Sequence, residues 1–193
     1  MHAQSSLRCS IGIKSLAYAS FLRVSTPNPD LHFTMKKQPT DERILSTQWA
    51  QRRVPDVIKW EVFPVRSGAT ATVTFESVKS PGQGIWFASD GGIEIDGTLH
   101  DEIVIWQRTA PKRITFVVRS SDDLLHFYNV WNDPRAVNHA GSQSFTSGML
   151  REELSSGARY RCNDLGFNKV FDRLVFTIEF GPQQESSSSP TQA

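Results

Sequence analysis

The chain has 193 residues, of which 38% are hydrophobic and 10% aromatic, and its formal net charge is +1. This length fits one domain with short extensions. The near-zero charge argues against nucleic acid or a membrane as a partner, and no apolar stretch is long enough to span a bilayer.

The two ends of the chain differ from the part between them. Residues 1–34 are rich in serine and poor in acids, and we expect a disordered arm, a targeting segment or an extension ahead of a start at Met35. Lys14 interrupts the apolar stretch that a secretion signal needs, so the sequence favours a cytoplasmic over a secreted protein. Residues 183–193 read as a disordered tail, which leaves residues 35–182 as the single folded domain.

One helix is predicted before the strands begin. Thr40 can cap a helix over Thr40–Arg52, in which Ile44, Leu45 and Trp49 share one side, and Pro55 would end it.

After this segment, apolar residues alternate with polar residues in run after run. The clearest alternating runs are 71–75, 93–96, 113–119 and 173–180. Turn residues separate the runs, as in Asp90-Gly91-Gly92 and Asp96-Gly97. This pattern is typical of half-buried strands in antiparallel sheets.

We count nine or ten such strands, which predicts an all-β protein. The expected fold is an antiparallel two-sheet β-sandwich of the jelly-roll or C2-like kind, and a closed barrel is the alternative. The alternation places five large side chains in the core: Phe75, Ile95, Phe116, Phe176 and Ile178.

The segment from Leu124 to Phe145 is the main candidate for a ligand site. Both faces of the strand 124–131 are largely apolar, which indicates a central strand, and a long irregular connection over 132–147 follows it. The polar side chains there suit a polyhydroxylated ligand. The predicted ligand-binding residues are His126, Asn129, Asn132, Asp133, Arg135 and His139.

Three hypotheses of function remain open at this point. The first is a non-enzymatic module that binds a small molecule or a glycan through the 132–147 loop. The second is a small hydrolase or isomerase that uses His126 with Asp133 or His139. The third is a protein-interaction or structural domain. Neither a paired-histidine metal motif nor a Cys-x-x-Cys pair occurs, and no cofactor is expected.

A resemblance is found near the end of the domain. The step Arg-Tyr-Arg-Cys-Asn-Asp at 159–164, followed by Phe-Asp-Arg-Leu-Val-Phe at 171–176, resembles the closing segment of uncharacterised bacterial β-sandwich proteins. In such modules the paired acids before the last strand look suited to calcium or to holding a loop. Here Arg173 replaces the second acid.

Three residues near these strand ends offer oxygen atoms to a hard cation. Asn163, Asp164 and Asp172 are therefore candidate calcium ligands. The alternative is that they cap turns and brace Arg161 or Arg173. The cysteine between the two arginines, Cys162, is expected to be buried and inert.

Overall fold

The structure is a computed structural model that describes residues 41–80, 82–132 and 140–183. The predicted arm 1–34, all of the predicted tail except Gln183, and the candidate residues Asp133, Arg135 and His139 lie outside these ranges.

The described chain forms eleven strands and one short helix. In chain order these are β1 (Ile44–Leu45), α1 (Thr47–Ala50), β2 (Ile58–Pro64), β3 (Ala69–Val78), β4 (Gln83–Ile95), β5 (Thr98–Trp106), β6 (Arg113–Val118), β7 (Leu124–Asn132), β8 (Ala140–Gly141), β9 (Gly148–Leu154), β10 (Gly157–Asn163) and β11 (Leu174–Gln183).

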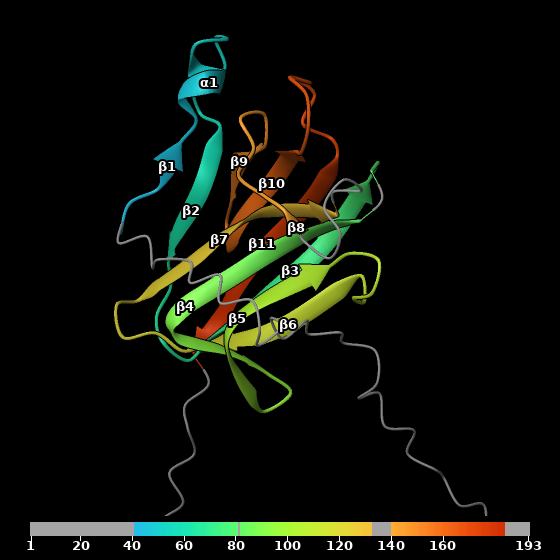
Figure 1. Cartoon of the computed structure of the whole chain (residues 1–193). Coiled ribbons are helices and arrows are strands. Elements are labelled where there is room, and N and C mark those ends of the chain that lie inside the picture. Colours follow the sequence, from blue (N-terminus) through green and yellow to red (C-terminus); the bar gives the residue numbers. More distant parts are fainter. Residues whose placement is uncertain (1–40, 81, 133–139, 184–193) are drawn as a thin grey trace, which may run out of the picture.

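Eight of the strands close into an antiparallel barrel (Figure 1). Neighbouring strands pair in the order β2-β9-β10-β11-β3-β6-β4-β7, and β7 pairs back onto β2. β1, β5 and β8 add to this barrel at its outside or its ends. The predicted two-sheet sandwich, jelly-roll or C2-like, is therefore wrong. The strands of this protein do not separate into two sheets, because the pairing of β2 with β7 closes the main sheet on itself.

The predicted count of nine or ten strands and the predicted N-terminal helix are also wrong. Ile44 and Leu45 pair with β2 instead of continuing a helix, so tertiary hydrogen bonds override the local helical pattern. Only Thr47–Ala50 is helical, with the Ser46 hydroxyl accepting a hydrogen bond from Trp49 N as its N-cap.

Aromatic side chains fill the middle of the barrel. Phe87 packs on Phe116 and Phe127, with ring centroids 5.1 and 5.3 Å apart, and Tyr160 stacks on Phe176 at 5.1 Å. These rings come from five strands, and their burial confirms the inward face that the alternation predicts. All five predicted core residues are buried: Phe75, Ile95, Phe116, Phe176 and Ile178. An eight-stranded barrel is just wide enough for side chains to fill it, so room for a ligand is found at its ends.

The barrel has one weak seam. β2 and β9 share a single register pair, Ile58 with Met149. Beyond it, the buried carboxylate of Glu61 on β2 lies 3.7 Å from Arg151 Nη1 on β9. This carboxylate accepts hydrogen bonds from Tyr160 Oη at 2.8 Å and from Arg43 Nε at 2.6 Å.

A second aromatic cluster lies on the other face of β7. Tyr128 stacks on Trp60 and on Trp86, with centroid distances of 5.3 and 4.8 Å, and the two indole rings lie 5.4 Å apart. Burial raises the pKa of the Tyr128 phenol, with a further contribution from Glu102. β7 is thus buried on both faces, as predicted for a central strand. In the described part of the chain, no helix is long and apolar enough to cross a membrane.

Candidate functional site

The two ends of the barrel differ in character. One end carries three segments that lie side by side: α1 with the turn after it, the loop 142–147 and the loop 163–173 (Figure 1). They lie together because the strands that they join are paired at this end, Ile58 with Met149, Met149 with Cys162, and Cys162 with Leu174. We call this the loop end. The other end is formed by the end of β2, the start of β3, the β9–β10 turn and the end of β11.

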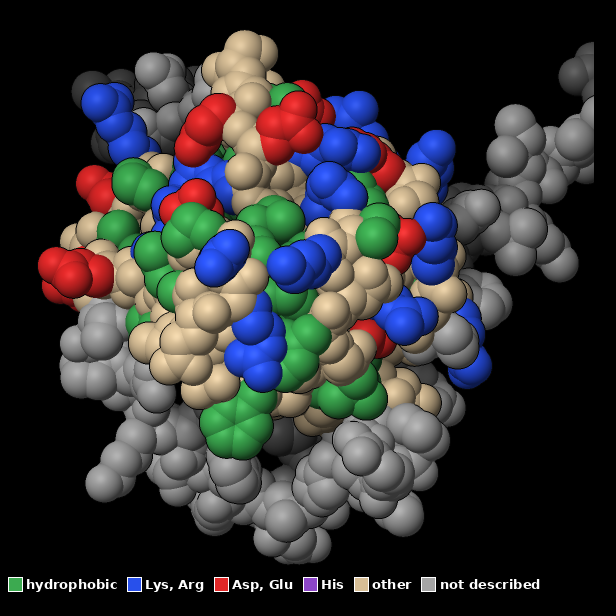
Figure 2. Space-filling view, turned by 90° about the horizontal axis from the view of Figure 1, so that it is seen from above, with side chains coloured by type: hydrophobic (Ala, Val, Ile, Leu, Met, Phe, Trp, Pro, Cys, Tyr) green, Lys and Arg blue, Asp and Glu red, His purple; other side chains and the backbone are tan. Residues whose placement is uncertain are grey.

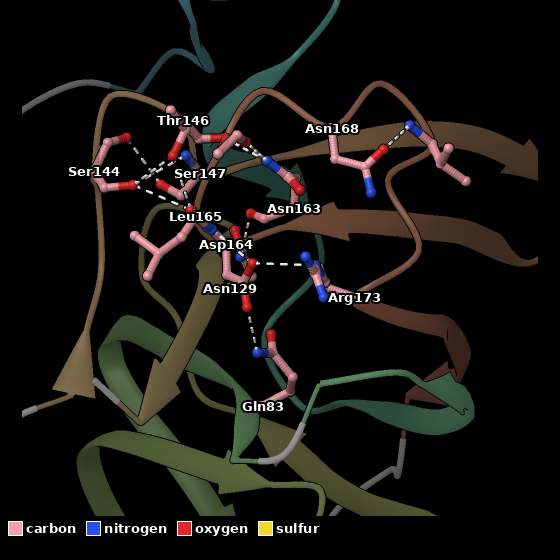
Figure 3. A network of polar contacts seen from close by, with 12 residues as sticks. Gln83, Asn129, Ser144, Thr146, Ser147, Asn163, Asp164, Leu165, Asn168 and Arg173 are labelled. Atoms are coloured by element: carbon pink, nitrogen blue, oxygen red, sulfur yellow. Dashed lines mark hydrogen bonds and ion pairs between the residues drawn. The ribbon is translucent and has the colours of Figure 1, made fainter. Parts of the chain in front are cut away.

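Buried amide and carboxylate side chains close the loop end (Figure 3). Gln83 Nε2 donates to Asp164 Oδ2 at 2.9 Å, and Asn129 Nδ2 donates to Asn163 O at 3.0 Å. The second oxygen of the Asp164 carboxylate lies 3.6 Å from Arg173 Nε. This network joins the ends of β4, β7, β10 and β11, and its polar groups brace the fold.

The same network holds the loop 142–147 in place. The hydroxyl groups of Ser144 and Thr146 donate to Asp164 O at 3.1 and 3.2 Å. Lys59 Nζ donates to the carbonyl oxygens of Ser144 and Ser147 and to the Ser147 hydroxyl. Burial lowers the pKa of Lys59 to about 8. The backbone of this loop is therefore anchored at several points.

The structure does not bring the described residues of the predicted ligand site together. Asn129 points into the barrel toward Asn163, whereas His126 lies on the opposite face of β7, where its Nδ1 accepts a hydrogen bond from Trp60 Nε1 at 3.3 Å. Asn132 is exposed, and its backbone N–H donates to Gly82 O at 2.7 Å. The alternation along 124–131 already indicates that His126 and Asn129 face opposite ways.

Two of the three candidate calcium ligands, Asp164 and Asp172, already have partners on their carboxylates, whereas no hydrogen bond to Asn163 Oδ1 is formed within the described chain. Asp164 accepts from Gln83 and faces Arg173, and Asp172 forms an ion pair with Lys79 at 2.7 Å. A cation would compete with the positive side chains at both carboxylates. Among the described residues, no group of three or more His, Cys, Asp or Glu side chains could hold a metal ion.

The thiol of Cys162 faces the interior and is fully buried. Burial raises its pKa well above the usual value, and the Asp164 charge adds to this effect. Because the thiolate is the reactive form, Cys162 is inert as a nucleophile.

The end of the barrel opposite the loop end is hollowed. A cavity of about 450 Å³, which we call the end hollow, opens there. Its walls are formed by Phe63, Pro64, Val65, Arg66, Ala69, Ser156, Gly157, Phe180 and Gly181.

Two stacked rings form the main apolar surface of the end hollow. Phe63 and Phe180 lie 4.5 Å apart between ring centroids, and Val65 and Ala69 add aliphatic surface. The guanidinium of Arg151 lies 4.8 Å from the Phe63 ring, and Arg66 is exposed on the rim. The arrangement offers contact to an apolar body, with positive charge beside it.

Sequence reasoning missed the end hollow because no motif marks it. Phe63 and Phe180 belong to strands far apart in the chain, and only barrel closure brings them together. The one usable signal was the aromatic residue near the end of each strand, and that signal does not distinguish a core residue from a wall residue.

Comparisons of the chain with protein-family models, with curated proteins and with solved structures find no match. These comparisons do not test the resemblance of segment 159–176 to bacterial β-sandwich proteins, so a common origin with them stays a prediction.

Proposed function

We propose that this protein is a non-enzymatic binding protein that takes a small, mainly apolar molecule in the end hollow. The observation that carries the proposal is the cavity itself, about 450 Å³ in volume with Phe63 and Phe180 on its wall. Ligand pockets in proteins typically measure about 300–1,000 Å³, and the mouth of a β-barrel is a common place for them.

The charge around the end hollow favours a ligand with an anionic group. Arg66 lines the rim, whereas Arg151 behind Phe63 is already paired with Glu153 at 2.7 Å and with Glu61 at 3.7 Å. A carboxylate or sulfonate on an otherwise apolar molecule would meet Arg66 as its body contacts the rings.

The described residues support catalysis less than they support ligand binding in the end hollow. His126 is packed against Trp60, and its proposed partners, Asp133 and His139, lie outside the described ranges. The carbohydrate ligand predicted for the 132–147 loop stays a prediction for the same reason.

A fluorescence titration with anilinonaphthalene sulfonate, an aromatic anion, tests the proposal. Ser156 is an exposed wall residue, so Ser156→Trp should obstruct the end hollow without disturbing the core. Ser155→Trp is the matched control, because Ser155 is exposed in the same turn and does not line the cavity.

The wild-type protein and Ser155→Trp should bind the probe with similar affinity, and Ser156→Trp should bind at least about tenfold more weakly at an unchanged melting temperature. Equal binding by the two tryptophan variants, or no binding by the wild type, would refute the proposed site.

A further inference from the structure

The loop end, at the opposite end of the barrel from the end hollow, exposes a cluster of apolar side chains. Seven large hydrophobic residues of the described chain are exposed, and four of them lie on the loops of this end. These four are Phe145, Leu165, Phe167 and Val170, and Phe145 is 79% exposed. Clustered apolar exposure of this kind marks an interaction surface more often than scattered single residues do.

The apolar loop tips are held close to one another. Ser144 and Thr146, which flank Phe145, both donate to the carbonyl oxygen that precedes Leu165. Phe167 packs edge-on against Trp49 at 5.1 Å. Because the loop backbones are anchored, a partner would meet this surface without first having to order it.

Cations surround the apolar tips. The segments 47–59, 142–147 and 161–173 together carry six lysines and arginines and three aspartates. Of these groups, Asp164 is buried and faces Arg173, Asp172 forms an ion pair with Lys79, and Lys59 donates into the loop 142–147. The charges that remain are Arg52, Arg53, Arg161 and Lys169 against Asp56, so the exposed charge is mainly positive. The Arg52 guanidinium lies 3.5 Å from the centroid of the Phe167 ring, which places charge directly beside apolar surface. Figure 2, which looks onto this end, shows hydrophobic side chains among several Lys and Arg side chains.

We infer that the loop end docks on an anionic lipid surface. Apolar side chains on loop tips can enter the headgroup region of a bilayer while nearby cations remain at the level of the lipid phosphates and carboxylates. The charge complementarity favours a membrane with acidic lipids over a neutral one. The outward projection of Phe145 favours a bilayer over a folded acidic protein, because a bilayer yields to a protruding ring.

The net charge of the whole chain does not reveal the positive charge of the loop end. The net charge of +1 averages the positive loop end with acids elsewhere, such as Asp101 and Glu102 on β5. The expectation from composition that no membrane is a partner depends on that average. Local charge within about a Debye length decides binding to a surface.

Sedimentation with lipid vesicles tests the inference. The full chain is mixed with vesicles of phosphatidylcholine alone and with vesicles that also contain phosphatidylserine, at low and high salt. We expect binding only to the serine-containing vesicles, with a loss at high salt. Lys169→Gln should weaken the binding about fivefold, and Phe145→Ser about tenfold.

The control variants make the same changes at the other end of the molecule. Leu99 is 58% exposed on the β4–β5 hairpin, so Leu99→Ser removes a comparable apolar side chain. Arg119→Gln removes a positive charge just after β6. Both should bind like the wild type.

Three results would overturn the inference. The first is that the wild type does not bind vesicles that contain phosphatidylserine. The second is that the control variants lose as much vesicle binding as Lys169→Gln and Phe145→Ser. The third is that the protein binds polyglutamate but not the vesicles. The last result would assign the loop end to an acidic polypeptide. All variants change exposed side chains, and an unchanged melting temperature confirms that they fold.

Discussion

The seam between β2 and β9 gives a prediction whose size follows from the structure. Tyr160→Phe removes the hydroxyl that donates to Glu61 Oε2 at 2.8 Å and leaves the ring in its stack on Phe176. Burial raises the Tyr160 pKa, with a further contribution from Glu61, so the phenol stays protonated across the physiological range. A hydrogen bond to a charged acceptor contributes about 1.5–3 kcal/mol.

We therefore expect Tyr160→Phe to lower the free energy of unfolding by about 2 kcal/mol, because the fully buried Glu61 carboxylate loses a donor that water cannot replace. In a Glu61→Gln background the acceptor is neutral, and the same change should cost only about 0.5–1.5 kcal/mol. Urea denaturation of the wild type, both single variants and the double variant measures the coupling.

An equal cost of Tyr160→Phe in both backgrounds would refute the reasoning, because the charge on Glu61 would then contribute nothing. A cost below about 0.5 kcal/mol in the wild-type background would show that this hydrogen bond does not stabilise the seam.

Three further predictions concern the rest of the barrel. Phe176→Ala should cost about 3–5 kcal/mol in urea denaturation, since the ring is fully buried, and a loss below about 1 kcal/mol would mean that the ring contributes little to the core. A hydrogen bond from the Ser121 side chain leads the interactions that lower the pKa of Asp90 to about 2. The wild type should therefore have a higher free energy of unfolding than Asp90→Asn above about pH 4, and this difference should disappear as the pH falls toward about 2. A difference in the free energy of unfolding that does not change with pH would contradict this. A Cβ at Gly157 would overlap the backbone oxygen of Ile178 on β11, so Gly157→Ala should cost about 1–3 kcal/mol. Gly181→Ala, whose added Cβ would make only ordinary contacts, should melt like the wild type.

The strands and the core were predictable because alternation is a local property. The runs 71–75, 113–119 and 173–180 each place one apolar face inward, and the structure confirms it. The closure of the sheet was not predictable in this way. A strand in a sandwich and a strand in a small barrel show the same alternation. The barrel is closed by the pairing of β7 with β2, and nothing in the sequences of these two strands indicates that they pair.

The predicted helix shows how tertiary contacts override a local pattern. The spacing of Ile44, Leu45 and Trp49 fits a helix, but Ile44 pairs with Trp60 and Leu45 with Ile58. Those hydrogen bonds outweigh helix propensity at 44–45, which amounts to only a few tenths of a kcal/mol per residue.

The candidate site was only partly accessible to sequence reasoning. The loop after β7 was identified as polar, and its described end, with Ser144 and Ser147, does carry hydrogen bonds, but these anchor the loop to Lys59. A list of polar residues cannot separate groups that bind each other from groups that are available to a ligand. The end hollow is lined mainly by apolar residues and glycines, with Arg66 and Ser156 at its edge, and these residues form no recognisable motif in the sequence.

An NMR titration can locate the ligand on the protein residue by residue. Protein with isotope-labelled alanine and valine methyl groups is titrated with anilinonaphthalene sulfonate. We expect the methyl signals of Ala69 and Val65, which line the end hollow, to shift most, and the methyl signal of Ala50 at the loop end to stay unshifted. Unshifted Ala69 and Val65 signals at saturating probe, or shifts centred on Ala50, would contradict the assignment of the end hollow as the ligand site.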